Sequence, residues 1–150
     1  MQRKDRGGGL GLKKDVKISI RGRQTVDGES EVVEVFTDGT FHEKNGTYYV
    51  VYESEEDTGF KGTTTTVKIQ KNKVVMLRSA PAESQLIIEK GKRHLCSYNT
   101  GYGNVMIGIN GSKIDFDLNE RGGKVRFKYT IDVNSALLST HEVNIFVEEK

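Results

Sequence analysis

The 150-residue sequence contains one cysteine, one proline, three histidines and no tryptophan. Because a single cysteine cannot form a disulfide within the chain, Cys96 fits a reducing compartment, and we expect a cytoplasmic protein. No apolar run approaches the roughly 20 residues that a membrane-spanning helix needs, and the first residues lack the apolar middle of a secretory signal. The scattered histidines form no ligand pattern, so we expect neither a metal nor a cofactor.

Alanine is also scarce, with three residues, whereas valine, isoleucine and threonine together make up about a quarter of the chain. A branched β-carbon restricts side-chain rotation in a helix and suits the pleated surface of a strand. The 17 glycines then supply turns between strands. The composition predicts an all-β domain.

The basic charge is concentrated at one end of the sequence. Residues 1–14 carry five basic groups and one acid, and the rest carries 18 basic and 20 acidic groups, a balance of −2. Gly7–Gly11 lacks the strand, helix and Lys-Ser/Thr context of a phosphate-binding loop. We therefore predict a flexible basic leader over residues 1–14 and one domain over residues 15–150. The leader offers no groove-reading element, so no specific nucleic-acid partner is expected.

From Asp15 onward, apolar and polar residues alternate between closely spaced turn signals. Asp27-Gly28, Asp38-Gly39, Asn45-Gly46 and Asn110-Gly111 all predict turns, because these pairs tolerate positive φ angles. The clearest strand should place five residues inward, with Arg126, Lys128 and Thr130 outward: Val125, Phe127, Tyr129, Ile131 and Val133. A short helical turn is predicted within Ser135–Thr140.

Ten to twelve strands joined by tight turns must pair mainly with their sequence neighbours. The pattern predicts a single antiparallel meander, and closure into a barrel is the simplest way for so long a meander to avoid exposed edges. A β-sandwich is the alternative architecture, but it normally needs longer crossover connections.

The middle of the chain resembles the YwiB-like family of uncharacterised bacterial β-barrel proteins. The resemblance rests on Met76-Leu77-Arg78-Ser79 and, about twenty residues later, on Tyr98-Asn99-Thr100-Gly101-Tyr102-Gly103. It covers about residues 15–148. Ala80 stands where the family tends to have glycine, and Gly101 where it tends to have proline. The resemblance implies a calycin, or lipocalin-like, barrel in the cytoplasm of a Gram-positive-type bacterium, and it implies no activity.

Two features of this middle region are candidates for a binding site. Arg78 lies at the end of an apolar strand. Its guanidinium could bind an anion, or the side chain could have a structural role and close one end of the barrel. Tyr98, Thr100 and Tyr102 form a corner with flexible glycines, which could be the rim of a ligand pocket or a bulged bend. Arg78, Tyr98, Thr100 and Tyr102 are the predicted ligand-binding residues.

Two further groupings offer weaker chemistry. Asp115 and Asp117 share the polar phase of one strand, which indicates a solvated outer face more than a cation site. His94 and Cys96 alternate along another strand, but no third group or oxyanion donor accompanies them. No catalytic residue is predicted.

Three functional classes remain open: a barrel that binds a small organic ligand, a protein-interaction or assembly module with a filled core, and an enzyme. We favour the first, with a small amphipathic or anionic ligand at the barrel mouth. The second is the main alternative, and we do not expect an enzyme.

Overall fold

A computed structural model describes residues 13–53, 62–79, 83–99 and 102–150. The predicted leader and Thr100 therefore fall largely or wholly outside the described residues. Within the described parts every regular element is a strand, and no helix there is long and apolar enough to cross a membrane.

Ten strands follow one another along the chain. The first five are β1 (Lys14–Val26), β2 (Glu29–Lys44), β3 (Thr47–Glu53), β4 (Thr64–Gln70) and β5 (Lys73–Arg78). The second five are β6 (Ser84–Glu89), β7 (Arg93–Asn99), β8 (Asn104–Asn119), β9 (Gly122–Val133) and β10 (Ala136–Glu149).

All ten strands belong to one antiparallel sheet with the order β6-β5-β4-β3-β2-β1-β10-β9-β8-β7. Each strand pairs with its neighbour in sequence, except that β6 and β7 share no ladder and that β1 pairs with β10. The sheet curls so that its two edge strands face each other, which almost closes the barrel. This confirms the predicted all-β meander and its barrel architecture.

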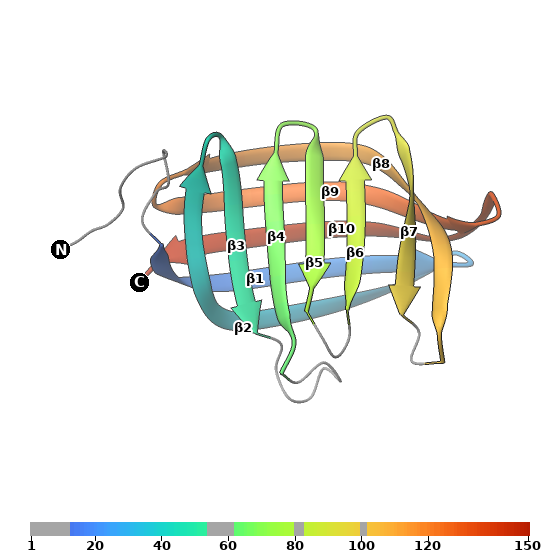
Figure 1. Cartoon of the computed structure of the whole chain (residues 1–150), viewed down its shortest axis with the longest axis horizontal. Helices are drawn as coiled ribbons and strands as arrows, with labels where there is room; N and C mark the ends of the chain where they lie inside the picture. Colours follow the sequence, from blue (N-terminus) through green and yellow to red (C-terminus); the bar gives the residue numbers. More distant parts are fainter. Residues whose placement is uncertain (1–12, 54–61, 80–82, 100–101) are drawn as a thin grey trace.

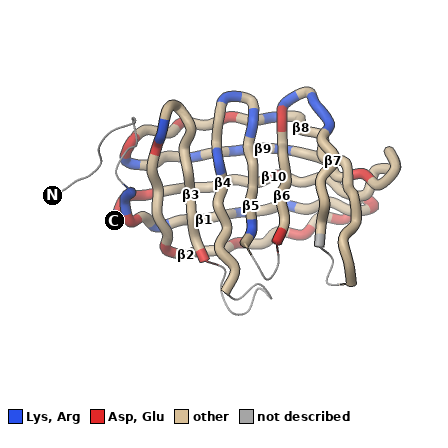
Figure 2. The backbone as a smooth tube through the Cα atoms, in the orientation of Figure 1, with Lys and Arg blue, Asp and Glu red and all other residues tan. Residues whose placement is uncertain are grey.

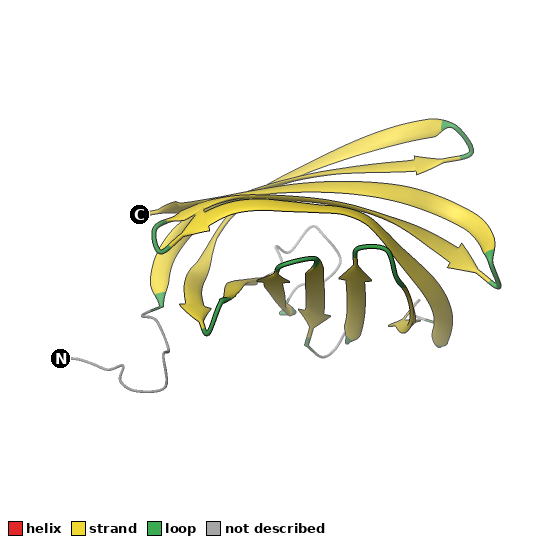
Figure 3. Ribbon diagram, turned by 90° about the horizontal axis from the view of Figure 1, so that it is seen from above, coloured by secondary structure: helices red, strands yellow, loops and turns green. Residues whose placement is uncertain are grey.

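The barrel has a long-stranded and a short-stranded half. In Figure 1 the short strands β3–β7 cross in front of the long strands β1 and β8–β10. Seen from above, the long strands form a curved layer whose hairpins extend past the short strands (Figure 3). The inward side chains of the two halves meet in the space between them, as in an orthogonal packing of sheets.

The interior is filled by large apolar side chains. Seven bulky ones are almost fully buried: Ile18, Phe41, Ile69, Ile88, Ile109, Phe127 and Ile145. Val125, Phe127 and Tyr129 point inward as predicted, and Ile131 and Val133 are half-buried against the same core. Arg126 is exposed, as expected for the opposite phase. The core phase of β9 was therefore predicted correctly.

The two turns with the strongest signals are confirmed. Asp27-Gly28 and Asn45-Gly46 both have positive φ at each residue, with values of 51° and 80° for the first pair and 52° and 84° for the second. This combination is the one that a two-residue type I′ hairpin requires.

Two other predicted turns are wrong, because the glycines there serve close packing instead. Asp38-Gly39 lies inside the continuous strand β2, and a β-carbon at Gly39 would collide with the Val51 carbonyl oxygen. Asn110-Gly111 lies inside β8, where the pairing with β9 shifts between Gly111 and Lys113. A β-carbon at Gly111 would collide with the backbone of Glu89. The predicted helical turn in Ser135–Thr140 is also wrong, since β10 begins at Ala136.

An ion pair that sequence reasoning missed ties β7, β8 and β9 together on the outer face. Arg93 donates from Nε and Nη2 to the Asp132 carboxylate at 3.0 and 2.6 Å, and Asn110 Nδ2 donates to it at 2.9 Å. The Ser135 amide donates a fourth bond at 3.1 Å. Gly108 lies under the Arg93 side chain and leaves it room. The hydrogen bond from Arg93 is the main reason that the pKa of Asp132 falls to about 2.

The core assignment predicts unequal effects of two neighbouring substitutions. Phe127→Ala should lower the free energy of unfolding by about 3–5 kcal/mol, because it leaves a cavity between the two halves of the barrel. Lys128→Ala should change it by less than about 0.5 kcal/mol. Urea denaturation of both variants measures the difference. Equal effects at the two positions would contradict the register.

The ion pair predicts a change in acid stability. The pKa of Asp132 is depressed from 3.8 to about 2 in the folded protein. Its contribution to stability is therefore fully present above pH 3.8 and is lost as the pH falls through about 2. Asp132→Asn should lower the melting temperature at pH 7, and its deficit relative to wild type should shrink between pH 4 and pH 2. The exposed Asp117→Asn serves as the control and should follow wild type across this range.

Candidate functional site

The junction of the two edge strands, here called the seam, is where β6 and β7 lie side by side without a ladder. Within the described residues, hydrogen bonds between backbone groups tie it at one end. There the Gly91 amide donates to the Gly111 carbonyl at 2.9 Å, and the Gly111 amide donates to the Lys92 carbonyl at 3.3 Å. The missing side chain at Gly111 allows β8 to approach the turn between β6 and β7 this closely. The described residues therefore close the barrel wall at this end, and no ladder continues along β6 and β7.

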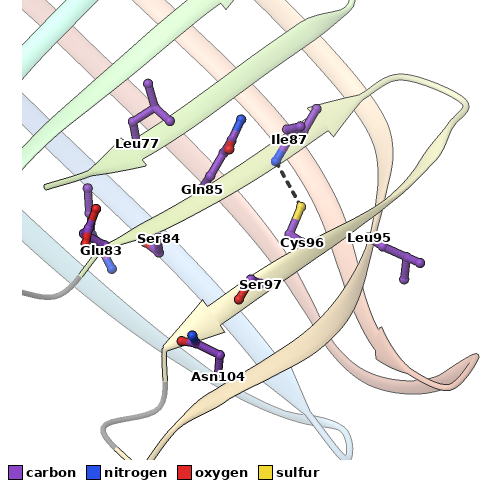
Figure 4. A pocket seen from close by; sticks show the side chains of 10 residues that line it. Leu77, Glu83, Ser84, Gln85, Ile87, Leu95, Cys96, Ser97 and Asn104 are labelled. Carbon is purple, nitrogen blue, oxygen red and sulfur yellow. Dashed lines mark hydrogen bonds between the residues drawn. The ribbon is translucent and has the colours of Figure 1, made fainter. Parts of the chain in front are cut away.

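Along the seam, two contacts that involve side chains join β6 and β7 within the described residues: a hydrogen bond between Glu89 and His94 near the tied end, and a weaker one further along. The Ile87 amide donates to the Cys96 thiol with an N–S distance of 3.5 Å, and sulfur is a poor acceptor. Beyond this contact β6 and β7 diverge, as Figure 4 shows. The Ile87 amide thus bonds to a thiol and not to a backbone carbonyl, and β6 and β7 separate from this position onward.

A groove of about 460 Å³ occupies the divergence of the two strands. Its walls come from the ends of β5 and β6 on one side and from β7 and the start of β8 on the other. The lining residues are Leu77, Arg78, Glu83, Ser84, Gln85, Ile87, Leu95, Cys96, Ser97 and Asn104. Apolar side chains thus line the wall beside a set of polar groups at its wide end.

Arg78 lies at the wide end of this groove and also faces into the barrel. It pairs with Thr65 across the ladder of β4 and β5, and Thr65 is fully buried. Burial raises the pKa of Tyr52 and raises that of Tyr129 to about 12, and in both cases the Arg78 charge opposes the rise. The guanidinium therefore lies within electrostatic reach of two largely buried phenols.

Buried polar side chains lie near Arg78 at this end of the barrel. Thr63 is fully buried on the approach to β4, and its hydroxyl has no hydrogen-bond partner within the described part of the chain. Burying an unpaired hydroxyl is unfavourable. In Figure 2 a basic residue marks the end of β5, and an acidic residue lies just before the start of β6.

Of the four predicted site residues, Arg78 lines the groove, and Tyr98 is not among the residues that line it. Arg78 and Tyr98 both influence the Tyr129 phenol, so they face the same end of the interior. Tyr102 is fully exposed, with a relative exposure of 101%, and Thr100 lies outside the described residues. Sequence reasoning missed the groove itself, because the groove lies where β6 and β7 meet, and no local signal reveals which strands form a seam.

The remaining groupings have other roles. His94 Nε2 lies 2.8 Å from Glu89 Oε1, and this hydrogen bond is the main cause that lowers the pKa of Glu89. His94 and Cys96 therefore each contact a group on β6 and not each other. Asp115 and Asp117 are both exposed, and Asp115 pairs across the sheet with Arg126. Among the described residues no cluster of three or more His, Cys, Asp or Glu side chains could hold a metal ion.

Comparison with known proteins agrees with this architecture. The chain is 24% identical over 139 residues to the uncharacterized beta-barrel protein YwiB of Bacillus subtilis (strain 168), covering 91% of this chain and 96% of the relative. The crystal structure of the ywiB protein from Bacillus subtilis superimposes with a TM-score of 0.83 at 22% sequence identity, covering 95% and 96% of the two chains. The family model described as a domain of unknown function, DUF1934, matches residues 18–145. The chain therefore belongs to the DUF1934 family of YwiB-like β-barrel proteins.

Proposed function

We propose that this protein binds a small amphipathic anion in the groove between β6 and β7. One observation carries the proposal: an arginine stands at the wide end of a groove of about 460 Å³ whose wall is otherwise partly apolar. Ligand sites commonly have volumes of roughly 300–1,000 Å³ and combine apolar walls with a few polar groups. Arg78 supplies the charge, and Leu77, Ile87 and Leu95 supply the apolar contacts.

The groove suits the ligand better than the centre of the barrel does. Phe41, Phe127 and Ile109 are fully buried and fill the space between the two halves. A ligand in the groove would displace none of these side chains. It would place its anionic group at Arg78 and its apolar part along β6 and β7. We extend this to a lipocalin-like mode of binding, in which a cytoplasmic barrel holds an organic acid at its mouth.

Arginine fits an anion at this position for two reasons. Its planar fork donates two parallel hydrogen bonds to a carboxylate or phosphate, which are stronger than bonds between neutral groups. Its charge also persists at any physiological pH. Glu83 lines the same groove and repels an anion, whereas Arg78 attracts one. Substituting each residue separately measures the two contributions to the binding affinity.

The proposal predicts how a simple amphipathic anion binds. Decanoate should bind the wild-type protein, and decanol should bind at least tenfold more weakly because it lacks the charge. Arg78→Met should weaken decanoate binding by about 10- to 100-fold, the equivalent of a charge-assisted hydrogen bond. Glu83→Gln should strengthen it. Isothermal titration calorimetry measures all four affinities.

Arg121→Met is the matched control, because it removes an exposed arginine from the turn between β8 and β9, away from the groove. It should bind decanoate like wild type, and thermal melting checks that both arginine variants fold. Unchanged binding in folded Arg78→Met would overturn the proposal. So would a wild-type protein that binds no decanoate, and a role as a filled interaction module would then be favoured.

A further inference from the structure

Within the described residues, some backbone groups of β6 and β7 have no backbone partner across the seam, and the strand geometry identifies them. In a strand, the amide and carbonyl of one residue point to the same side, and those of the next residue point to the other. The Ile87 amide is directed across the seam to the Cys96 thiol. The backbone groups of Ile87 and Gln85 on β6 therefore face the seam, while Leu86 and Ile88 face β5.

The backbone groups of β7 alternate in the same way. The Lys92 carbonyl accepts a bond from the Gly111 amide, so it points toward β8. By alternation the backbone groups of Cys96 and Tyr98 also face β8, whereas those of Leu95 and Ser97 face the seam. No ladder joins β6 to β7, so among the described residues the amides and carbonyls of Gln85, Leu95 and Ser97 have no backbone partner across the seam.

These backbone groups lie within the groove that contains Arg78. Its lining includes the residues whose backbone groups face the seam: Gln85 and Ile87 on β6, and Leu95 and Ser97 on β7. Each wall therefore presents backbone amides and carbonyls beside an apolar side chain. Exposed edges of this kind accept an added strand from another chain. A fatty acid can contact the apolar wall, but its chain has no amide to bond with the exposed backbone.

We propose that the amphipathic anion is an extended peptide segment, which adds along the seam as a strand and places a carboxylate at Arg78. This inference rests on the proposed function and specifies its ligand class. The carboxylate comes from a chain terminus or from an acidic side chain, since Arg78 would grip either in the same way. Peptide carbonyls would also offer the Ile87 amide a stronger acceptor than the Cys96 thiol.

The first probe is the pentapeptide acetyl-Lys-Val-Thr-Val-Thr with a free C-terminal carboxylate, titrated by fluorescence anisotropy after labelling its lysine. Two matched peptides carry N-methyl groups on every second backbone nitrogen. In one peptide the methyl groups block the donors along one edge of the extended strand, and in the other they block the donors along the opposite edge. At least one methylated set should bind five- to tenfold more weakly, because it has lost the donors that pair with the seam. If neither set binds more weakly, strand addition is wrong.

Two further peptides identify the source of the carboxylate. The first peptide has a C-terminal amide, and it should bind about tenfold more weakly than the free acid if the terminal carboxylate contacts Arg78. The second also has a C-terminal amide but carries glutamate at its last position. It should bind as tightly as the free acid if a side-chain carboxylate can contact Arg78 equally well. Arg78→Met should weaken the free-acid peptide to the level of the amide. Equal affinity of the acid and both amides would overturn the assignment of the carboxylate.

Failure of this inference is distinguishable from failure of the proposed function. If decanoate binding depends on Arg78 but N-methylation leaves peptide binding unchanged, the groove binds anions without strand addition. If neither decanoate nor the free-acid peptide responds to Arg78→Met, both proposals are wrong.

Substitutions in the protein provide an independent test. Leu95→Asp puts a negative charge in the groove wall and should weaken the peptide at least tenfold, whereas Phe36→Asp changes an exposed apolar residue on β2 and should have no effect. Hydrogen exchange observed by NMR should show fast exchange at the Leu95 and Ser97 amides in the free protein and slowed exchange with bound peptide. Slow exchange at both amides in the free protein would contradict the open seam.

Discussion

The fold depends on how a curled sheet satisfies the backbone hydrogen bonds of its two edge strands. A meander of ten strands has one edge at β6 and one at β7, and a fully closed barrel would join them with a continuous ladder. Within the described residues, the backbone bonds at this junction lie around Gly111, and Glu89–His94 and Ile87–Cys96 add two contacts that involve side chains. The groove exists because the ladder stops there, and its position next to Arg78 follows from the strand order.

The partial closure also explains why the interior and the groove differ in character. The centre of the barrel is packed with large apolar side chains from both halves, so it contributes stability. Toward the open end, the inward positions are occupied by threonines, tyrosines and an arginine. The polar end and the open wall thus belong to one region.

The strands and their inward faces could be predicted from the sequence because alternation is a local property. The phase of β9 followed directly from Val125, Phe127 and Tyr129. Glycines were harder to interpret, since Gly28 and Gly46 make turns whereas Gly39 and Gly111 permit close backbone contact inside strands. A glycine after Asp or Asn has the same local signature in both cases. Only the three-dimensional arrangement shows which neighbour would collide with a side chain.

The candidate site was predictable in part for the same reason. Arg78 is conspicuous in sequence as a cation at the end of an apolar strand, and Tyr98 shares its end of the barrel. The opposing groove wall depends on which edges meet, which is a property of the complete sheet. The bond between Arg93 and Asp132 was missed because it joins residues 39 positions apart on the outer face. Neither residue breaks the alternation of its own strand.

The pairing of β1 with β10 has a consequence for how the chain folds. These strands come from the two ends of the domain, yet they lie at the centre of the sheet and join the group β1–β6 to the group β7–β10. During synthesis from the N-terminus, β1 must wait with one edge unpaired until the final strand has emerged. Contacts between residues so distant in sequence slow folding, because a long loop must close before they form. Assembly of the barrel is therefore completed only after nearly the whole chain has been made.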